Sequence, residues 1–277
     1  MSPSPLTDFS RLCVHTITTK PWVIEEAMDR YAAADVGGIT VWRQWLEGRD
    51  PESIGEKLRS RNLEIVSLCR GGFFPSDSDA GLAAAIEDNR AAIREAAALG
   101  APMIVLVCGA VPGQPLEDSR KQIADGIAAV VPLAEEHGIR LAIEPLHPMY
   151  ADDRSAINTL ASANEVCDRL DHPLVGIAAD VYHIWWDPDL ADQIRITGEK
   201  DRLFAFHVCD WKTPTSDFLN DRGLMGEGCI DIPGIRALVE AAGFSGFNEV
   251  EIFSDRWWAQ DQDHFLTEIK KAYLEHC

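Results

Sequence analysis

The sequence predicts a single (β/α)8 barrel, an α/β fold that spans residues 1–277 as one domain. Eight short apolar runs recur along the 277 residues, and segments with helical periodicity lie between them. Each repeat has about 35 residues, which is enough for a strand and a helix, a pair that needs roughly 30. The runs are nearly continuous rather than alternating, as expected for parallel strands that are covered on both faces.

The eight predicted strands are rich in β-branched and other apolar residues. In chain order they are Leu12–Ile17, Ile39–Trp42, Leu63–Leu68, Met103–Val107, Leu141–Ile143, Val175–Ala178, Leu203–Val208 and Val250–Phe253.

The predicted helices carry apolar residues at helical spacing, and several are followed by a glycine that can cap a helix. Gly100, Gly138 and Gly243 occupy such positions. Pro132 falls inside one predicted helix and is expected to kink it. In chain order the predicted helices are Glu25–Ala34, Glu52–Arg59, Asp79–Leu99, Glu117–His137, Asn158–Leu170, Pro233–Ala242 and Asp261–Leu274.

A doubly wound open sheet is the main alternative fold. It predicts a glycine-rich phosphate loop after the first strand. Here His-Thr-Ile-Thr-Thr-Lys-Pro-Trp follows instead, and the chain contains neither GxGxxG nor GxxxxGK[ST]. The sequence therefore favours the barrel.

Composition narrows the class of partner. The chain has 25 Lys and Arg against 45 Asp and Glu, a net charge of −20 that argues against nucleic acid. No apolar stretch approaches the ~20 residues that span a bilayer. The start, MSPSPLTDFSR, lacks the basic and apolar regions of a signal peptide. Seven cysteines without a CxxC pair indicate a reducing compartment, so we expect a cytoplasmic protein with no membrane partner.

Charged residues mark the ends of the last four predicted strands. Glu144, Asp180, His207 and Glu251 follow one another at spacings of 36, 27 and 44 residues. Barrels place their chemistry at the carboxyl ends of the strands, so all four would meet at one rim. Three carboxylates and one imidazole suit Mn²⁺, Mg²⁺, Co²⁺ or Zn²⁺. The alternative is four separate buried polar groups, each satisfied by hydrogen bonds.

Together these motifs resemble the xylose isomerase-like TIM barrel superfamily, and within it the sugar phosphate isomerase/epimerase branch. The motifs are Glu144-Pro145, Asp180-x-x-His183, His207-x-x-Asp210, Gly-Glu-Gly-x-Ile-Asp at 226–231 and Val250-Glu251. The resemblance implies one divalent metal, usually manganese, bound by Glu144, Asp180, His207 and Glu251. It also implies that the two glutamates are the catalytic acid/base pair.

The same resemblance suggests substrate contacts. His183 matches a family histidine that contacts a substrate oxygen. A substrate-binding arginine usually lies six residues after the histidine of the seventh strand, where this chain has Thr213, so Arg222 is the nearest candidate. His15 in the first strand and Lys212 near the rim are further candidates. Proteins of this kind are often homo-oligomers, so a homo-oligomer is also expected.

The chemistry of such a site can be argued from general principles. A divalent cation stabilises the enediolate that forms when a proton leaves the carbon next to a carbonyl. One carboxylate removes the proton, and a second carboxylate opposite can return one to the other face. Return to the opposite face epimerises the carbon, and return to the adjacent carbon isomerises the sugar. The predicted function is therefore a metal-dependent keto-sugar epimerase or isomerase.

His147 leaves a second reaction open. It lies three residues after Glu144 and could act as an extra base in β-elimination from a 3-keto-glycoside. The chain would then be a metal-dependent lyase or hydratase. The alternative is a solvent-exposed loop histidine.

Tryptophans follow predicted strands two, six, seven and eight, and Trp185 and Trp211 are candidates for stacking on a small carbohydrate substrate. They could equally pack in the core or at a subunit interface. Because the loops have no glycine-rich phosphate nest, an unphosphorylated substrate is favoured.

Two rival functions remain. The apurinic endonucleases of the same superfamily use three zinc ions held by additional histidines, but no histidine lies between His15 and His137. A non-catalytic sugar-binding barrel would keep the tryptophans but would not need paired glutamates.

Overall fold

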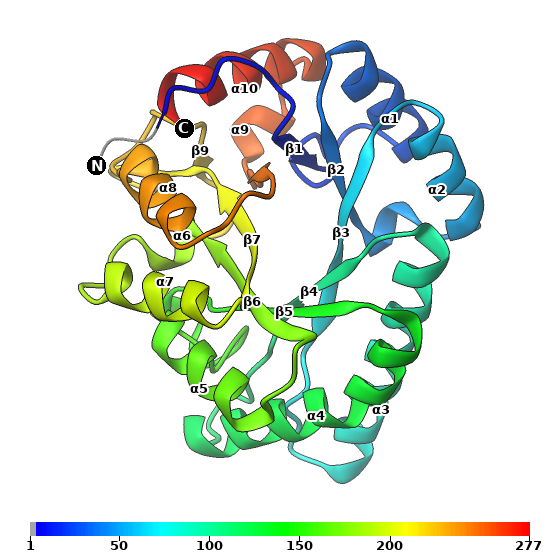
Figure 1. The fold of residues 1–277 in the computed structure, drawn as a ribbon, viewed down its shortest axis with the longest axis vertical. Helices are drawn as coiled ribbons and strands as arrows, with labels where there is room; N and C mark the ends of the chain where they lie inside the picture. Colours follow the sequence, from blue (N-terminus) through cyan, green and yellow to red (C-terminus); the bar gives the residue numbers. More distant parts are fainter. Residues whose placement is uncertain (1–3) are drawn as a thin grey trace.

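A computed structural model describes residues 4–277, while Met1–Pro3, at the start of the segment examined for a signal peptide, lie outside the described residues. Eight parallel strands form a closed barrel, and the predicted (β/α)8 fold is confirmed (Figure 1). The strands are β1 (Leu12–His15), β2 (Gly38–Trp42), β3 (Glu64–Gly72), β4 (Met103–Val107), β5 (Arg140–Glu144), β6 (Val175–Asp180), β7 (Leu203–Val208) and β10 (Asn248–Val250).

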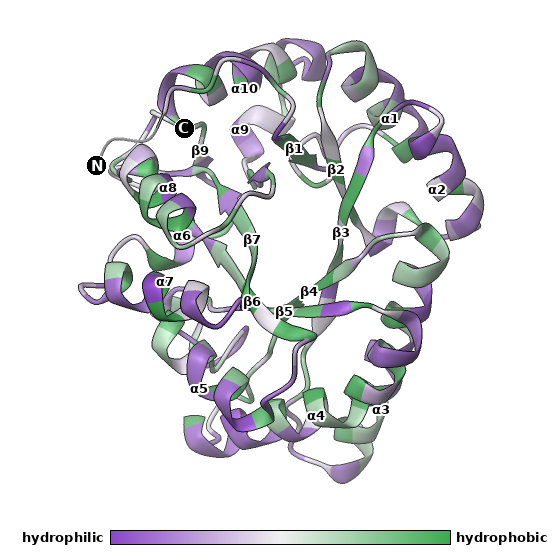
Figure 2. Cartoon of the chain, in the orientation of Figure 1, coloured by the Kyte–Doolittle hydropathy of each residue, from purple (hydrophilic) through white to green (hydrophobic). Residues whose placement is uncertain are grey.

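Helices surround the barrel and bury their apolar faces against the strands (Figures 1 and 2). They are α1 (Ile24–Ala33), α2 (Pro51–Arg59), α3 (Asp79–Leu99), α4 (Leu116–His137), α5 (Leu160–Leu170), α6 (Val181–Ile184), α7 (Leu190–Glu199), α8 (Ile232–Ala241), α9 (Asp255–Trp258) and α10 (Gln262–His276). Two 3₁₀ turns, η1 (Arg43–Trp45) and η2 (Pro148–Tyr150), lie in the loops after β2 and β5.

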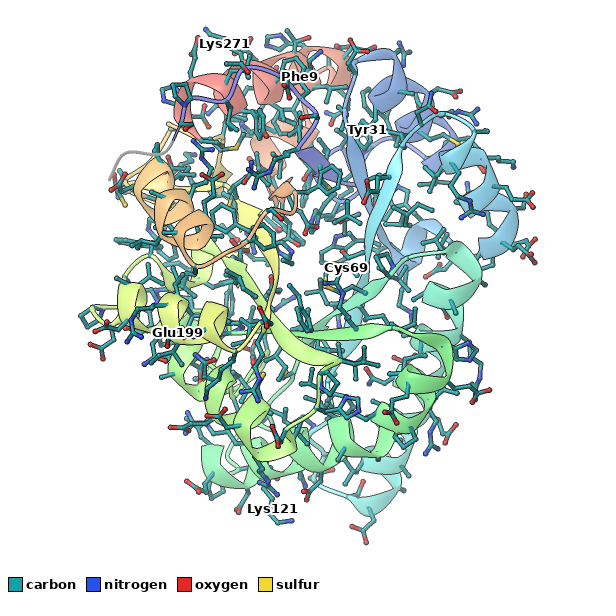
Figure 3. All side chains as sticks on the ribbon, viewed as in Figure 1. Phe9, Tyr31, Cys69, Lys121, Glu199 and Lys271 are labelled. Carbon is teal, nitrogen blue, oxygen red and sulfur yellow. The ribbon has the colours of Figure 1, made fainter. Side chains whose placement is uncertain are left out.

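The side chains divide between the core and the surface as the composition suggests. Figure 3 shows Cys69 inside the ring of strands, whereas Lys121 and Glu199 lie on the outside. Cys69, Cys108 and Cys209 are buried, as their apolar surroundings predict. None of the helices between residues 4 and 277 combines the length and the apolar character needed to cross a bilayer.

The seven predicted helices appear within two residues of their expected bounds, and α4 continues through Pro132. Helix α7 was not predicted. Its buried face, Leu190, Ile194 and Thr197, contains only two apolar residues, which makes its periodicity weak in the sequence.

The last barrel strand was placed two residues too late. Strand β10 is Asn248–Val250, and its register pairs Val250 with Val14 on one side and Val208 on the other. The apolar residues Ile252 and Phe253 lie beyond the strand, where Phe253 packs edge-on against Trp42 at 5.3 Å between ring centroids. Glu251 therefore follows the strand directly, and Glu249 lies within it.

A short antiparallel ribbon lies in the loop region after β7. It pairs β8 (Asp210–Trp211) with β9 (Arg222–Gly223). Asp210 holds the following loop by accepting hydrogen bonds from the backbone N–H groups of Gly226, Gly228 and Ile230 at 2.8–3.0 Å. This ribbon places Arg222 at the mouth of the barrel.

Asn89 of α3 ties that helix to the end of β3. Its Oδ1 accepts from the N–H of Gly72, and its Nδ2 donates to the carbonyl of Gly72, both at 2.7 Å. Gly72 has φ +105°, and a Cβ there would lie 1.9 Å from the carbonyl oxygen of Val107. Only glycine fits this position. Asn89 provides the side-chain hydrogen bonds to both backbone groups of Gly72.

Replacing Asn89 by Ala is expected to lower the free energy of unfolding by about 1–3 kcal/mol, because two buried backbone groups lose their partner. Urea unfolding followed by circular dichroism would measure the change. Glu87→Ala, an exposed position on the same helix, should stay within about 0.5 kcal/mol of the parent. Equal stabilities of the two variants would contradict the role given to Asn89.

Candidate active site

The four predicted metal ligands converge at the carboxyl-terminal rim of the barrel. Glu144 ends β5, Asp180 ends β6, His207 lies in β7 and Glu251 follows β10. Their ligand-type atoms all lie within 4.8 Å of one another. All four residues are at most 4% exposed. Neighbouring register explains part of this geometry, because Asp180 pairs directly with His207 across the β6–β7 ladder.

Local structure orients each ligand-type side chain. Asp180 caps the short helix α6, since one carboxylate oxygen accepts from the N–H of Tyr182 at 2.8 Å. Its other oxygen accepts from Arg222 at 2.8 Å. Nδ1 of His207 lies 3.0 Å from Oε1 of Glu144.

The site carries an excess of negative charge. Arg222 contacts both Asp180 and Glu251 at 2.8 Å, and one guanidinium alone does not balance three carboxylates, so the nearby histidines also carry positive charge. Burial raises the pKa of Asp180 to about 7, even though Arg222 opposes the shift. For Glu251, burial works against ionisation, yet the positive charges of Arg222 and His15 hold its pKa well below the ordinary value.

The donor set fits a divalent cation. Three carboxylates and one imidazole provide oxygen and nitrogen atoms of the types that Mn²⁺, Mg²⁺, Co²⁺ and Zn²⁺ accept. Burial alone would lower the pKa of His207, but the charge of Glu249 and the hydrogen bond with Glu144 raise it to about 9. A cation at this point would replace that proton and balance the carboxylates. Nε2 of His207 is buried and has no hydrogen-bond partner among residues 4–277.

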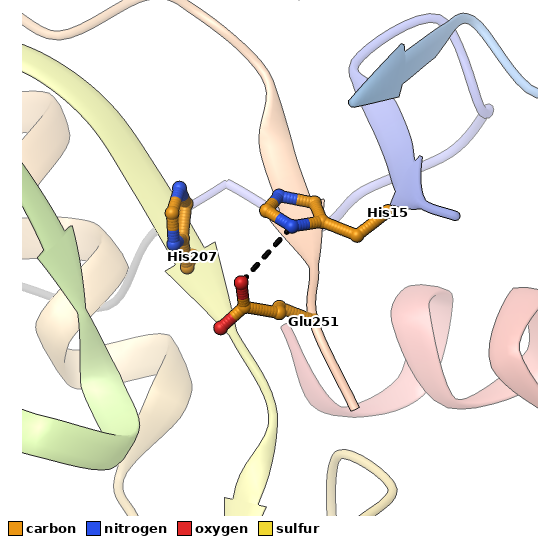
Figure 4. A group of neighbouring side chains, drawn as sticks. All are labelled: His15, His207 and Glu251. Carbon is orange, nitrogen blue, oxygen red and sulfur yellow. Dashed lines mark ion pairs between the residues drawn. The ribbon is translucent and has the colours of Figure 1, made fainter. Parts of the chain in front are cut away.

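A second polar layer lies beneath the four predicted ligands, inside the barrel. The imidazole of His15 bridges Glu249 and Glu251 with a distance of 3.1 Å on each side; Figure 4 shows its contact with Glu251 beside His207. Glu249 also accepts from the hydroxyl of Thr40 at 2.6 Å and lies 3.9 Å from Nε2 of His207.

This layer is charged. Burial opposes the ionisation of Glu249, yet His207 and His15 lower its pKa below the ordinary value. Burial also lowers the pKa of His15, but hydrogen bonds with Cys69, Glu249 and Glu251 raise it well above the ordinary value. Glu249 was not among the predicted site residues, and its signal in the sequence is a glutamate inside an otherwise apolar strand.

A pocket opens above the four predicted ligands. Of the predicted substrate contacts, His183 and Arg222 line it. Of the predicted ligands, Glu144 and Glu251 line it. The other lining residues are Trp42, Arg70, Val107, Leu146, Tyr150, Arg154, Leu219 and Phe253.

Two contacts position His183 in the pocket wall. The N–H of His147 donates to its Nδ1 at 3.2 Å, and Nη2 of Arg222 lies 3.2 Å from its Nε2. Burial and the charge of Arg222 lower the pKa of His183 well below the ordinary value, so the ring is neutral.

The remaining predicted substrate contacts are not among the residues that line this pocket. The ring of His147 packs against Trp186 and Trp211, with centroid distances of 5.6 and 5.1 Å. Trp185 packs on Trp211 as well. Lys212 forms an ion pair with Asp221, and His15 lies in the layer below.

Fold and site together define a class: a closed (β/α)8 barrel with a buried carboxylate–imidazole cluster at its carboxyl-terminal rim. The xylose isomerase-like TIM barrel family matches residues 28–272, and the chain belongs to this family. The resemblance found in the sequence is confirmed.

Two solved structures share the fold. The chain is 45% identical to protein SMc04130 from Sinorhizobium meliloti 1021, with a TM-score of 0.93 over 96% of this chain and 98% of that one. A crystal structure of the IolI protein with a bound zinc atom is 20% identical, with a TM-score of 0.83 over 96% of this chain and 97% of that one.

Among characterised sequences, the chain is similar to inosose isomerases. It is 21% identical to the Bacillus velezensis enzyme over 83% of this chain and 81% of that protein. The match to the Bacillus subtilis enzyme, at 23% identity, covers 57% of this chain and 56% of that protein, slightly more than half of its length.

Proposed function

We propose that this protein is a metal-dependent isomerase or epimerase that moves a proton next to the carbonyl group of a keto-sugar. The observation that carries the proposal is the convergence of two buried glutamates, Glu144 at the end of β5 and Glu251 after β10, within one cluster of ligand-type atoms. Similarity to inosose isomerases supports the reaction class.

Glu144, Asp180, His207 and Glu251 would hold the metal, for which Mn²⁺ is the first candidate. A divalent cation supplies Lewis acidity that stabilises negative charge developing on the carbonyl oxygen. The pocket above the ligands is the place for the sugar, with His183 and Arg222 in its wall.

The two glutamates divide the proton transfers. The low pKa of Glu251 keeps its carboxylate ionised and able to accept a proton from carbon. Glu144 would start in its protonated form and supply a proton to the substrate, while Glu251 keeps the proton taken from carbon. Return to the same carbon gives the epimer, whereas return to the neighbouring carbon gives the isomer.

The lyase alternative depends on His147 as an additional base. Its ring is held between two tryptophans, outside the residues that line the pocket, so no observed contact favours elimination over epimerisation. A non-catalytic sugar-binding barrel does not account for the buried pair of glutamates.

The deciding experiment incubates Mn²⁺-loaded protein in D₂O with a ketohexose, a ketopentose and a 3-keto-glucoside, and follows each by NMR. The proposal predicts deuterium incorporation next to the carbonyl together with an epimer or isomer. Release of the aglycone would identify a lyase instead. Binding without exchange on any of the substrates would contradict catalysis.

A further inference from the structure

Two arginines line the mouth of the pocket without an acidic partner. Arg70 lies at the end of β3 and Arg154 in the loop after η2, and both line the pocket that contains Glu144 and Glu251. Both side chains are half-buried. Within residues 4–277, neither guanidinium has a hydrogen bond or an ion pair.

The neighbouring arginines are paired, which makes these two stand out in a chain of net charge −20. Arg43 bonds Asp88 and Glu95, and Arg222 bonds Asp180 and Glu251. Asp88, Glu95, Asp180 and Glu251 are therefore already engaged. Burial lowers the pKa of Arg70, and the charge of Arg154 lowers it further, so the two guanidinium groups repel each other. A bound anion would remove this unfavourable interaction.

Aromatic rings hold both groups in place. The guanidinium of Arg70 lies 4.1 Å from the ring centroid of Phe73, and that of Arg154 lies 5.6 Å from the ring of Tyr150. Stacking on a ring occupies the face of a guanidinium and leaves its N–H edges available. This geometry suits planar or tetrahedral oxyanions, which accept two such N–H groups at once.

There is also room beside the pair. Arg70 borders a second cavity of about 510 Å³, which lies between the loop after β2 and the end of β3. Arg70 lines both this cavity and the pocket over the glutamates, so an anion at its guanidinium would lie beside open space.

We propose that Arg70 and Arg154 form an anion subsite, and that the substrate carries a carboxylate or phosphate group at the end remote from the reacting carbon. The substrate class is then a sugar acid or a sugar phosphate. This inference rests on the proposed function for the position of the reacting carbon, but binding of the anion does not depend on turnover.

The test uses three six-carbon polyols that lack a carbonyl and differ at one end: D-glucitol, D-gluconate and D-glucitol 6-phosphate. Isothermal titration of the full-length, Mn²⁺-loaded protein should show about 10-fold or greater preference for one of the anions over glucitol. Preference for gluconate identifies a carboxylate site, and preference for glucitol 6-phosphate identifies a phosphate site.

Arg70→Gln and Arg154→Gln should each remove about 10-fold or more of the affinity for that anion and leave the affinity for glucitol unchanged. Arg61→Gln is the matched control. Arg61 lies just before the start of β3, at the end of the barrel opposite the pocket, and forms an ion pair with Asp29. It changes the net charge equally and should leave all three affinities unchanged. Circular dichroism melting would verify folding of every variant.

The outcomes separate the two proposals. Equal affinity for all three probes, no binding of any of them, or an anion preference unaffected by both arginine variants would overturn the subsite. Anion preference that depends on both arginines, without deuterium exchange on any substrate, would leave the subsite standing and overturn the proposed reaction.

Discussion

Glu251→Gln is expected to slow deuterium exchange next to the substrate carbonyl by roughly 10²–10⁴-fold while sugar binding remains detectable. Glutamine keeps the shape of the side chain and one carbonyl oxygen for Arg222 or His15, but it cannot accept the proton from carbon. Glu144→Gln should block the return of the proton. It should therefore reduce product formation more than exchange.

NMR of the substrate in D₂O measures exchange, and titration with the sugar measures binding. Glu165→Gln is a suitable control because Glu165 is an exposed residue of α5, far from the rim. It should behave as the parent. Undiminished exchange in Glu251→Gln would disprove the assignment of this residue as the base.

His207→Ala is expected to abolish the stabilisation of the protein by Mn²⁺. Three carboxylates remain, but the cluster of four loses its one imidazole and therefore its nitrogen donor. For the parent, Mn²⁺ at 100 times its dissociation constant should add about 2.7 kcal/mol to the free energy of unfolding. Melting curves with Mn²⁺ and with EDTA measure this difference without any substrate.

Glu249→Gln provides a graded comparison for the same measurement. Glu249 does not belong to the cluster of four, but it lies 3.9 Å from Nε2 of His207 and bonds His15, which in turn contacts Glu251. Carboxylates behind a metal-ligating histidine typically contribute 10–100-fold to metal affinity, and a loss of that size is expected here. Parent-like Mn²⁺ affinity in His207→Ala would contradict the proposed set of four ligands. Parent-like affinity in Glu249→Gln would contradict only the proposed role of Glu249 in supporting His207.

Much of the fold follows from local properties of the chain. Apolar runs and helical periodicity predict the eight strands and seven helices because both signals lie within a few neighbouring residues. Helix α7 was missed because its buried face includes a threonine, Thr197. The last strand was placed too late because Ile252 and Phe253 are apolar, as strand residues are, although they lie beyond the strand. Those two residues follow the strand and are held by tertiary packing.

The same distinction applies to the site. The positions of Glu144, Asp180, His207 and Glu251 near strand ends are visible in the sequence, and parallel closure of the barrel brings strand ends to one rim. The layer of His15, Thr40 and Glu249 requires the register among β1, β2 and β10, which no local pattern specifies.

The sequence by itself determined the barrel, the family resemblance and the four residues of the ligand cluster, because each depends on order and spacing along the chain. Only the tertiary structure decided which charges are paired. It placed His147 and Trp211 against each other, engaged Lys212 with Asp221, and left Arg70 and Arg154 without an acid at the pocket. Pairing depends on distances between side chains from different βα units, and those distances exist only after the barrel closes.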